Sequence, residues 1–234
     1  MIDFHSHILP NIDDGSRNME QTVEILKEAK NAGFNKIIST SHYMEEYYNI
    51  DEEQRKKLIE EVKEQSQGIE LFLGSEIYVT GNIVELLKDQ KASTINNSKY
   101  VLFELPLNTK EIMAKEVIYR LIENNYVPII AHPERYKYVQ ENIEYIMELV
   151  DMGALLQSNY GSIIGMYGRK SESTVKKLLK EDAVQFLGSD VHREKQVYDK
   201  IPKILKKLNK IVSKEKIDEL TIINPQKVLN NEEI

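Results

Sequence analysis

Residues 1–15, MIDFHSHILPNIDDG, combine a short apolar run with a high density of histidine and aspartate. The chain contains 5 histidines, and His5 and His7 are two of them. Side chains at positions i and i+2 face the same side of a β-strand, so both imidazoles can reach one bound group. The stretch therefore predicts a first strand at residues 2–5 that ends in a polar site.

Short apolar runs and longer amphipathic runs alternate along the rest of the chain, which is typical of repeated βα units. We expect seven strands, at residues 2–5, 36–40, 69–73, 99–103, 127–131, 154–158 and 184–188. A first helix has Met19, Val23, Leu26 and Ala29 on one face and ends at Gly33. Further helices are expected near residues 52–66, 110–125, 138–152, 171–181 and 195–212, with a last short one from Pro225.

The order of these elements predicts the fold class. No antiparallel hairpin signal separates the expected strands, which favours an α/β fold whose parallel sheet closes into a (βα)7 TIM-like barrel. An open, doubly wound sheet is the alternative. No linker or repeat divides the chain, so we expect residues 1–234 to form a single domain.

The composition excludes several classes of function. A formal charge of −7 and a pI of about 5.4 weigh against nucleic acid as the partner, and the lysines of residues 203–210, KILKKLNK, fit a solvated helix face. No apolar run approaches the ~18 residues of a membrane span, and no secretory signal is visible, so a cytoplasmic location is expected. With 0 cysteines, a zinc–thiolate site and a cysteine nucleophile are excluded.

The remaining histidines also follow predicted strands. His42 comes after the second strand, His132 after the fifth and His192 after the last. Glu76, Glu104 and Asp190 also follow predicted strands, and Asp14 lies in the loop after the first strand. Because the C-terminal ends of parallel barrel strands meet at one rim, we expect all nine side chains to converge there.

This set of side chains predicts a metal site. Imidazoles mixed with carboxylates, and no thiolate, suit zinc, iron or manganese. Nine ligands are enough for two or three ions, which would lower the pKa of bound water to about 7 and leave a positive cluster suited to a phosphate ester. Arg135 is the expected phosphate clamp. Arg193 is either a second anion contact or a plain charge at the rim. Asp3 is expected to orient a ligand histidine, and Asp13 to do the same or to cap the following segment.

Six segments, DFHSHILPNIDDG, TSHY, GSEI, FELP, AHPERY and GSDVH, together resemble the PHP (polymerase and histidinol phosphatase) superfamily. Within it, the sequence is most similar to the bacterial manganese-dependent protein-tyrosine phosphatases of the CpsB type, which accompany a tyrosine kinase in capsule and exopolysaccharide synthesis. The resemblance extends over nearly the whole chain, and it implies a distorted seven-stranded barrel with a trinuclear metal site. The sequence departs from the family pattern at two places. Tyr43 stands where a second histidine is usual, and after His192 the family usually has another phosphate-contacting arginine several residues on, whereas this segment offers only Arg193.

The resemblance also implies a role for each residue. His5 and His7 would bind one Mn²⁺ ion with Glu76 and Asp190. Glu76 would bridge to a second ion held by Glu104 and His132, and Asp14, His42 and His192 would hold the third. Fe, Zn or Mg are possible substitutes. Arg135 would bind the phosphate of a tyrosine-phosphorylated protein, expected to be the partner kinase.

The same residues are also compatible with other functions. The same cluster could hydrolyse a small phosphate ester such as histidinol phosphate, or it could belong to a non-catalytic metal-binding module. A metal-dependent amidohydrolase would commonly need a lysine at a strand end, and none is there. Residues 43–49, YMEEYYN, form either a wall of the substrate slot or a surface loop. The glycines of residues 161–168, GSIIGMYG, lack the spacing of a nucleotide-binding loop and fit a tight turn.

Overall fold

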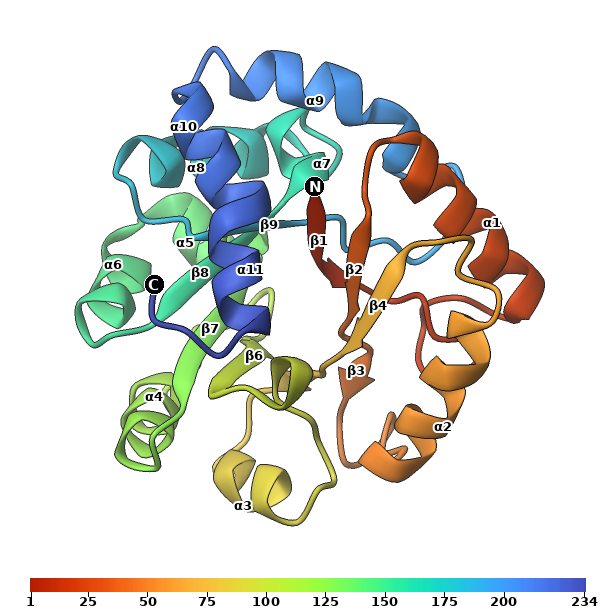
Figure 1. Cartoon of the computed structure of the whole chain (residues 1–234). Coiled ribbons are helices and arrows are strands. Elements are labelled where there is room, and N and C mark those ends of the chain that lie inside the picture. The colour runs from red at the N-terminus through yellow and green to blue at the C-terminus, as the bar shows by residue number, and fades with distance from the viewer.

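Parallel strands form the centre of the computed structural model, which describes residues 1–234 (Figure 1). They make two sheets with the orders β1-β2-β4 and β3-β5-β6-β7-β8-β9. The strands are β1 (Ile2–Ser6), β2 (Lys36–Ser39), β3 (His42–Tyr43), β4 (Glu70–Leu73), β5 (Glu76–Tyr78), β6 (Tyr100–Glu104), β7 (Val127–Ala131), β8 (Leu155–Asn159) and β9 (Phe186–Gly188). Every pair within the sheets is parallel, so the predicted α/β class with parallel strands is confirmed.

Two of the seven expected strands are broken, and the prediction missed their second halves. The strand expected at 36–40 ends at Ser39, and β3 follows after two residues. The strand expected at 69–73 is likewise followed by β5. A Cβ atom at Gly74, in the second break, would lie 2.7 Å from Ile95 Cδ1, so a larger residue there would have to displace the end of the Ile95 side chain. The breaks turn the chain into the second sheet.

The two sheets also meet at their other ends. Ser6 of β1 forms a parallel bridge with Val191, just beyond β9. The amide of Asp190 donates to the carbonyl of His5 over 2.8 Å, and the amide of His7 donates to the carbonyl of Val191 over 3.0 Å. Beneath this junction, Phe4 stacks on Phe186 with ring centroids 4.0 Å apart. The first and last strands are thus adjacent, although residues 7–185 separate them in sequence.

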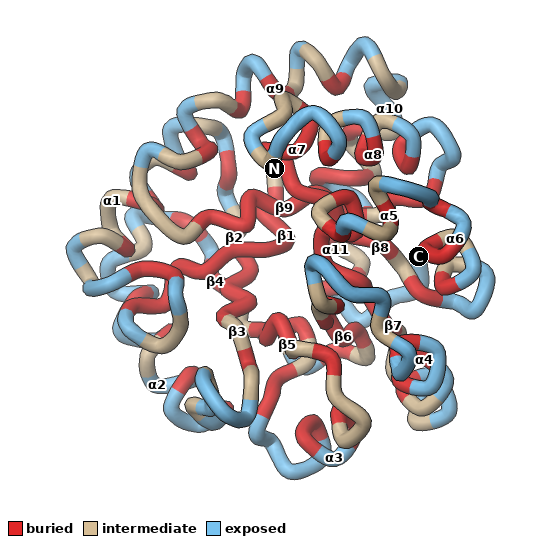
Figure 2. The backbone as a smooth tube through the Cα atoms, turned by 180° about the vertical axis from the view of Figure 1, so that it is seen from behind, coloured by how far each residue is buried: buried red, intermediate tan, exposed pale blue.

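Helices surround the strands (Figure 1). They are α1 (Met19–Asn31), α2 (Glu52–Lys63), α3 (Ile83–Lys88), α4 (Ala114–Glu123), α5 (Lys137–Glu141), α6 (Glu144–Asp151), α7 (Tyr160–Ile163), α8 (Arg169–Lys180), α9 (Ile201–Leu208), α10 (Lys214–Asp218) and α11 (Asn224–Leu229). Figure 2 shows the buried residues at the centre and the exposed residues on the outer turns of the helices. None of these helices combines the length and apolarity needed to cross a membrane.

Local sequence explains both ends of α1. Asn18 caps α1 by accepting a hydrogen bond from the amide of Gln21 over 2.9 Å, and Gly33 follows the helix with φ of 91°. The buried residues of α1 are Thr22, Ile25, Leu26 and Ala29, which include two of the four predicted core positions. Met19 is partly buried and packs against the core, and Val23 is half-buried.

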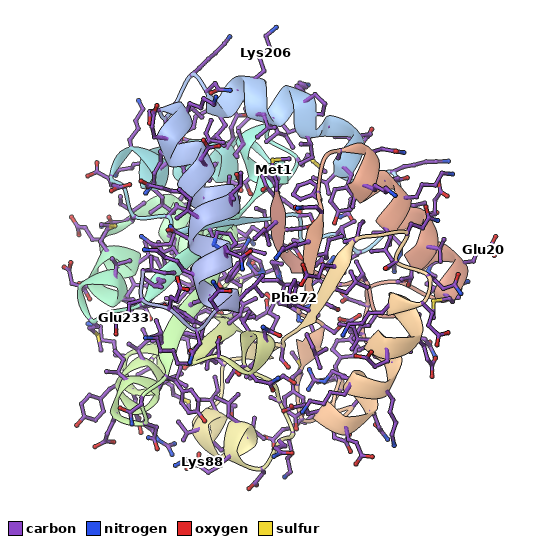
Figure 3. The ribbon with its side chains drawn as sticks, viewed as in Figure 1. Met1, Glu20, Phe72, Lys88, Lys206 and Glu233 are labelled. Carbon is purple, nitrogen blue, oxygen red and sulfur yellow. The ribbon has the colours of Figure 1, made fainter.

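Two expected helices are shorter or divided. The helix expected at 138–152 is split into α5 and α6 because Asn142 is extended, with φ of −150°. Only Ile201–Leu208 of the region 195–212 forms an α-helix, and Lys206 points outward from its end (Figure 3). Lys203 and Lys210 are exposed too, which confirms the solvated face predicted for this segment.

Candidate metal centre

The nine predicted ligands lie together at the C-terminal ends of the strands. Each belongs to a group of three or four side chains whose donor atoms lie within 4.8 Å of one another. The groups are His7 with Asp14, His42 and His192; His5 with His7 and Asp190; His5 with Glu76 and His132; and His42 with Glu76 and Glu104. Because the groups share members, they form one continuous cluster.

Glu76 and Asp190 occupy the middle of this cluster. Oε2 of Glu76 lies 3.5 Å from Nε2 of His5 and 3.3 Å from Nε2 of His7. Oδ1 of Asp190 lies 3.4 Å from each of the same two nitrogens. Ligands held at ~2.1 Å around one ion are separated by about 3.0–3.5 Å, which matches these distances. Two imidazoles and two carboxylates thus have the spacing of a single coordination sphere.

Further groups adjoin this centre on two sides. His132 Nε2 lies 2.7 Å from Glu76 Oε1. His42 Nδ1 lies 3.1 Å from Glu76 Oε2 and 3.5 Å from Glu104 Oε1, while its Nε2 lies 3.6 Å from Asp14 Oδ1. His42 therefore faces Glu76 with one ring nitrogen and Asp14 with the other.

Several of these atoms are buried without a hydrogen-bond partner. They are Nε2 of His5 and of His7, Nδ1 of His42 and Oε2 of Glu76. Buried polar atoms are nearly always hydrogen-bonded, so four unpartnered nitrogen and oxygen atoms facing one another need another explanation. Nitrogen and oxygen atoms in this arrangement fit divalent cations, and no sulfur competes for a softer metal.

The pKa values of the carboxyl groups reflect the crowding of charge. Burial favours the neutral form of Glu76, but the surrounding His5, His42 and His132 hold its pKa well below the usual range. Burial and the neighbouring charges of Glu76 and Asp190 raise the pKa of Glu104 well above the usual range. A bound cation would relieve this repulsion and keep all the carboxylates ionised.

Asp13 orients His7, which was one of its two predicted roles. Its Oδ2 accepts from Nδ1 of His7 over 2.8 Å and from the amide of His42 over 2.9 Å, and its Oδ1 accepts from the amide of Gly15 over 2.8 Å. Because a carboxylate only accepts, Nδ1 of His7 carries the proton and Nε2 presents its lone pair to the cluster.

Asp13→Asn is expected to weaken metal binding by roughly 10–100-fold, because the amide no longer fixes the tautomer of His7. Metal affinity is measured by competition with a chromogenic chelator, and Asp51→Asn, which alters an exposed helix cap, is the matched control. An unchanged affinity in Asp13→Asn would show that Asp13 serves only the loop.

The prediction for Asp3 is wrong. Its carboxylate does not hydrogen-bond the imidazole of a ligand histidine, and it accepts from the amide of Ser189 over 2.7 Å and from the hydroxyl of Tyr198 over 2.6 Å. Complete burial raises the pKa of Asp3 to about 6. Asp3 holds the start of β1 against the segment that leads into Asp190, so it supports the ligand strand from behind.

Two supporting residues were missed from the sequence. Thr40 Oγ1 lies 2.6 Å from Nδ1 of His5, which leaves Nε2 toward the cluster. Asn159 Nδ2 donates to Asp190 Oδ2 over 2.7 Å. Each partner is at least 31 residues away in sequence, so the only available signal was their position at the ends of predicted strands.

Arg135 lies beside the cluster, in the turn that follows β7. Its Nη1 donates to Asp190 Oδ2 over 2.6 Å, and its guanidinium carbon lies 4.7 Å from the ring centroid of Tyr167. Arg135 forms no ion pair with the neighbouring Glu134, which is buried and accepts from the amide of Asn159. Arg135 is three-quarters buried and keeps further N–H groups for an anion.

Arg193 is occupied differently. Its Nη1 donates to the carbonyl of Asp14 over 2.7 Å, to that of Gly15, and to that of His192 over 2.6 Å. These bonds hold the Asp14 loop next to His192. The arrangement gives Arg193 a structural part in the cluster, and its role as an anion contact stays a prediction.

Arg55 of α2 is the largest fully buried side chain, and it connects two of the ligand strands. Its guanidinium donates to Ser75 Oγ, next to Glu76, and to the carbonyl of Lys91 over 2.8 Å. It also lies 5.5 Å from the ring centroid of Tyr43, which follows His42. Arg55 thereby links the segments next to His42 and Glu76 on the neighbouring strands β3 and β5.

Arg55→Met is expected to lower the free energy of unfolding by about 2–4 kcal/mol, because the Ser75 hydroxyl and the Lys91 carbonyl lose a charged donor. Urea unfolding measures this change. Lys57→Met, on the exposed face of the same helix, is expected to cost less than ~0.5 kcal/mol. Equal stabilities of the two variants would contradict the role given to Arg55.

Comparison with known proteins agrees with this geometry. The family model described as capsular polysaccharide synthesis, CpsB/CapC, matches residues 1–230. CapC of Staphylococcus aureus is 34% identical over 82% of this chain and 77% of its own length. The tyrosine-protein phosphatase CpsB of Streptococcus pneumoniae is 30% identical over 98% of each chain.

Solved structures extend the comparison. A structure from work on YwqE of Bacillus subtilis and CpsB of Streptococcus pneumoniae, described as unique metal-dependent tyrosine phosphatases, superposes with a TM-score of 0.91 at 28% identity and covers 100% of this chain and 96% of its own. Histidinol phosphate phosphatase from Lactococcus lactis shares the fold, with a TM-score of 0.59 at 16% identity over 90% of this chain and 93% of its own. The chain therefore belongs to the CpsB/CapC family of capsular polysaccharide synthesis.

Proposed function

We propose that this protein is a metal-dependent protein-tyrosine phosphatase that hydrolyses phosphotyrosine directly, without a covalent enzyme intermediate. The observation that carries the proposal is the ring of unpartnered imidazole and carboxylate atoms around Glu76, with Arg135 beside it. The proposed substrate is a tyrosine-phosphorylated protein of the cytoplasm, in particular a tyrosine kinase that controls capsule synthesis. The family description and the named activities of the relatives support this choice.

The metal assignment is part of the proposal. We assign His5, His7, Glu76 and Asp190 to one ion, Glu76, Glu104 and His132 to a second, and Asp14, His42 and His192 to a third. We propose Mn²⁺ for all three, with Fe, Zn or Mg as substitutes, since the donors are nitrogen and oxygen alone. Bound there, divalent cations lower the pKa of water towards ~7 and polarise the phosphoryl oxygens.

The side chains would divide the remaining work among them. Arg135, held by Asp190 and flanked by Tyr167, directs its free N–H groups at the phosphate oxygens and fixes their orientation. Asp13 and Thr40 fix the imidazoles of His7 and His5, so that neither ring reorganises during the reaction. The leaving phenol has a pKa of ≈10, which reduces the need for a general acid.

We also propose that the chain acts as one domain whose curled parallel strands form a distorted seven-stranded barrel. The bridge from Ser6 to Val191 and the hydrophobic core shared by residues from Ile8 to Leu220 support it.

Backbone strain at two of the ligands also supports a functional site. His132 and Asp190 have φ values of 35° and 53°, and such left-handed backbone is costly for non-glycine residues and concentrates at functional sites.

A substrate panel tests the proposed function. The purified protein is supplied with Mn²⁺ and given a phosphotyrosine peptide, the matching phosphoserine peptide and histidinol phosphate. We expect kcat/KM to be highest on the phosphotyrosine peptide, by about tenfold or more over the aliphatic esters. A preference for histidinol phosphate would assign the site to small esters, and no hydrolysis of any compound would identify a non-catalytic module.

A further inference from the structure

An apolar cavity of about 420 Å³ lies beside the metal centre, in the sector of the rim formed by β3, β5 and α3. These elements adjoin one another in the lower half of Figure 2. Six hydrophobic side chains line the cavity, namely Tyr43, Met44, Tyr47, Tyr78, Val79 and Leu86. None of them is a proposed ligand, so the metal chemistry does not explain this cavity.

The cavity adjoins strands that also carry proposed metal ligands. Tyr43 and Tyr78 stand on the same two strands as His42 and Glu76, and Tyr78 is paired in register with Glu104. Tyr78 also lines a second hollow of about 330 Å³ together with Glu104, Leu105, Pro106 and Leu107. Tyr78 therefore borders both the apolar cavity and the hollow that contains Glu104, a proposed metal ligand.

The loop over the cavity is ordered by its own hydrogen bonds. The amides of Tyr47 and Tyr48 donate to the carbonyl of Met44 over 2.9 and 2.8 Å, and the amide of Met44 donates to the carbonyl of Tyr48 over 2.8 Å. Tyr48 stacks on the ring of His42 with centroids 5.8 Å apart, while Tyr47 is 72% exposed at the mouth of the cavity. A large exposed aromatic side chain at a preformed apolar cavity is typical of a recognition site.

Charges at the same mouth restrict what binds there. Glu45 and Glu46 line the cavity, and Glu45 Oε2 accepts from Asn82 Nδ2 over 3.1 Å, which connects the loop to the start of α3. The adjoining polar hollow is lined by four acidic residues, Glu45, Asp51, Glu53 and Asp89, and by one basic residue, Lys91. A segment that carries acidic residues would be repelled at this side of the rim.

We propose that this cavity is a substrate subsite that accepts an apolar side chain of the phosphotyrosine segment, next to neutral or basic rather than acidic residues. The inference rests on the proposed function, since the phosphate would be bound at the metal centre while the flanking apolar residue enters the cavity. It also assigns residues 43–49 to the wall of the substrate slot, the first of the two roles predicted for them.

The test compares substrates and variants. Phosphotyrosine peptides carry leucine, serine or aspartate at each flanking position in turn, and p-nitrophenyl phosphate serves as a substrate too small to reach the cavity. For the wild-type protein we expect leucine at one position to raise kcat/KM about tenfold over serine, and aspartate there to lower it. Tyr47→Ser should abolish the leucine preference and leave p-nitrophenyl phosphate hydrolysis unchanged. Glu46→Gln should reduce the discrimination against aspartate.

Tyr119→Ser is the matched control, because Tyr119 of α4 is 62% exposed and lies outside the cavity. It should keep the full leucine preference. Equal kcat/KM values for all flanking residues, with p-nitrophenyl phosphate still hydrolysed, would overturn the subsite and leave the phosphatase proposal standing. No hydrolysis of p-nitrophenyl phosphate by the wild-type protein would instead overturn the phosphatase proposal. A halved molecular mass of Tyr47→Ser in light scattering would assign the cavity to a second copy of this chain and overturn the subsite.

Discussion

Glu76→Gln is expected to reduce phosphotyrosine hydrolysis by roughly 10³-fold or more, the largest effect of any single substitution in this chain. Glu76 is fully buried, and its two oxygens lie within 3.5 Å of ring nitrogens of His5, His7, His42 and His132. An amide of the same shape removes one negative charge from the position shared by two of the proposed ions. Steady-state kinetics and elemental analysis of the purified variant measure both losses.

Folding must be separated from chemistry in this experiment. Glu123→Gln, on an exposed position of α4, makes the same chemical change outside the cluster and should keep full activity and metal content. Circular dichroism of both variants checks that the fold is retained. Folded Glu76→Gln protein with wild-type turnover would remove Glu76 from the mechanism.

Arg135→Ala is expected to lower kcat/KM for phosphotyrosine by about 10²–10³-fold while the metal content stays at the wild-type level. Arg135 donates to Asp190, but Asp190 also accepts from Asn159, so the ligand carboxylate keeps a partner after the substitution. Arg135→Lys should recover only part of the loss, because an ammonium lacks the planar pair of donors that binds phosphate in bidentate fashion.

The exposed Arg169 provides the control for this pair of variants, and Arg169→Ala should leave kcat/KM unchanged. If Arg135→Ala lost its metal together with its activity, Arg135 would be a support for Asp190 rather than a phosphate contact. Wild-type kinetics in Arg135→Ala would contradict both roles.

The C-terminal ends of the strands could be predicted from the sequence, and these ends indicated where the metal-ligand cluster lies. The apolar runs before His5, His42 and His132 are short and bounded by polar residues, so period and length identified these strands. Parallel topology then placed their C-terminal ends on one side. The convergence of the nine side chains follows from topology alone, and it required no knowledge of individual contacts.

Features that depend on distant partners escaped the sequence analysis. Arg55 stands among charged residues of α2, and nothing nearby indicates that it is buried against Ser75, 20 residues away. Gly74 lies close to Ile95, and the carboxylate of Asp3 accepts a hydrogen bond from Tyr198 rather than from a histidine ring. Both contacts join residues that are distant in sequence. Local patterns report which face of an element is apolar, whereas these contacts depend on how elements meet.

The central claim is that the clustered imidazoles and carboxylates bind several divalent cations, on which phosphotyrosine hydrolysis depends. Its most direct test is one titration: the protein is stripped with a chelator, desalted, and assayed on a phosphotyrosine peptide while Mn²⁺ is restored and bound metal is counted. We expect no activity in the stripped protein and full activity as bound Mn²⁺ approaches about three ions per chain. Undiminished turnover by protein shown to contain no metal would contradict it.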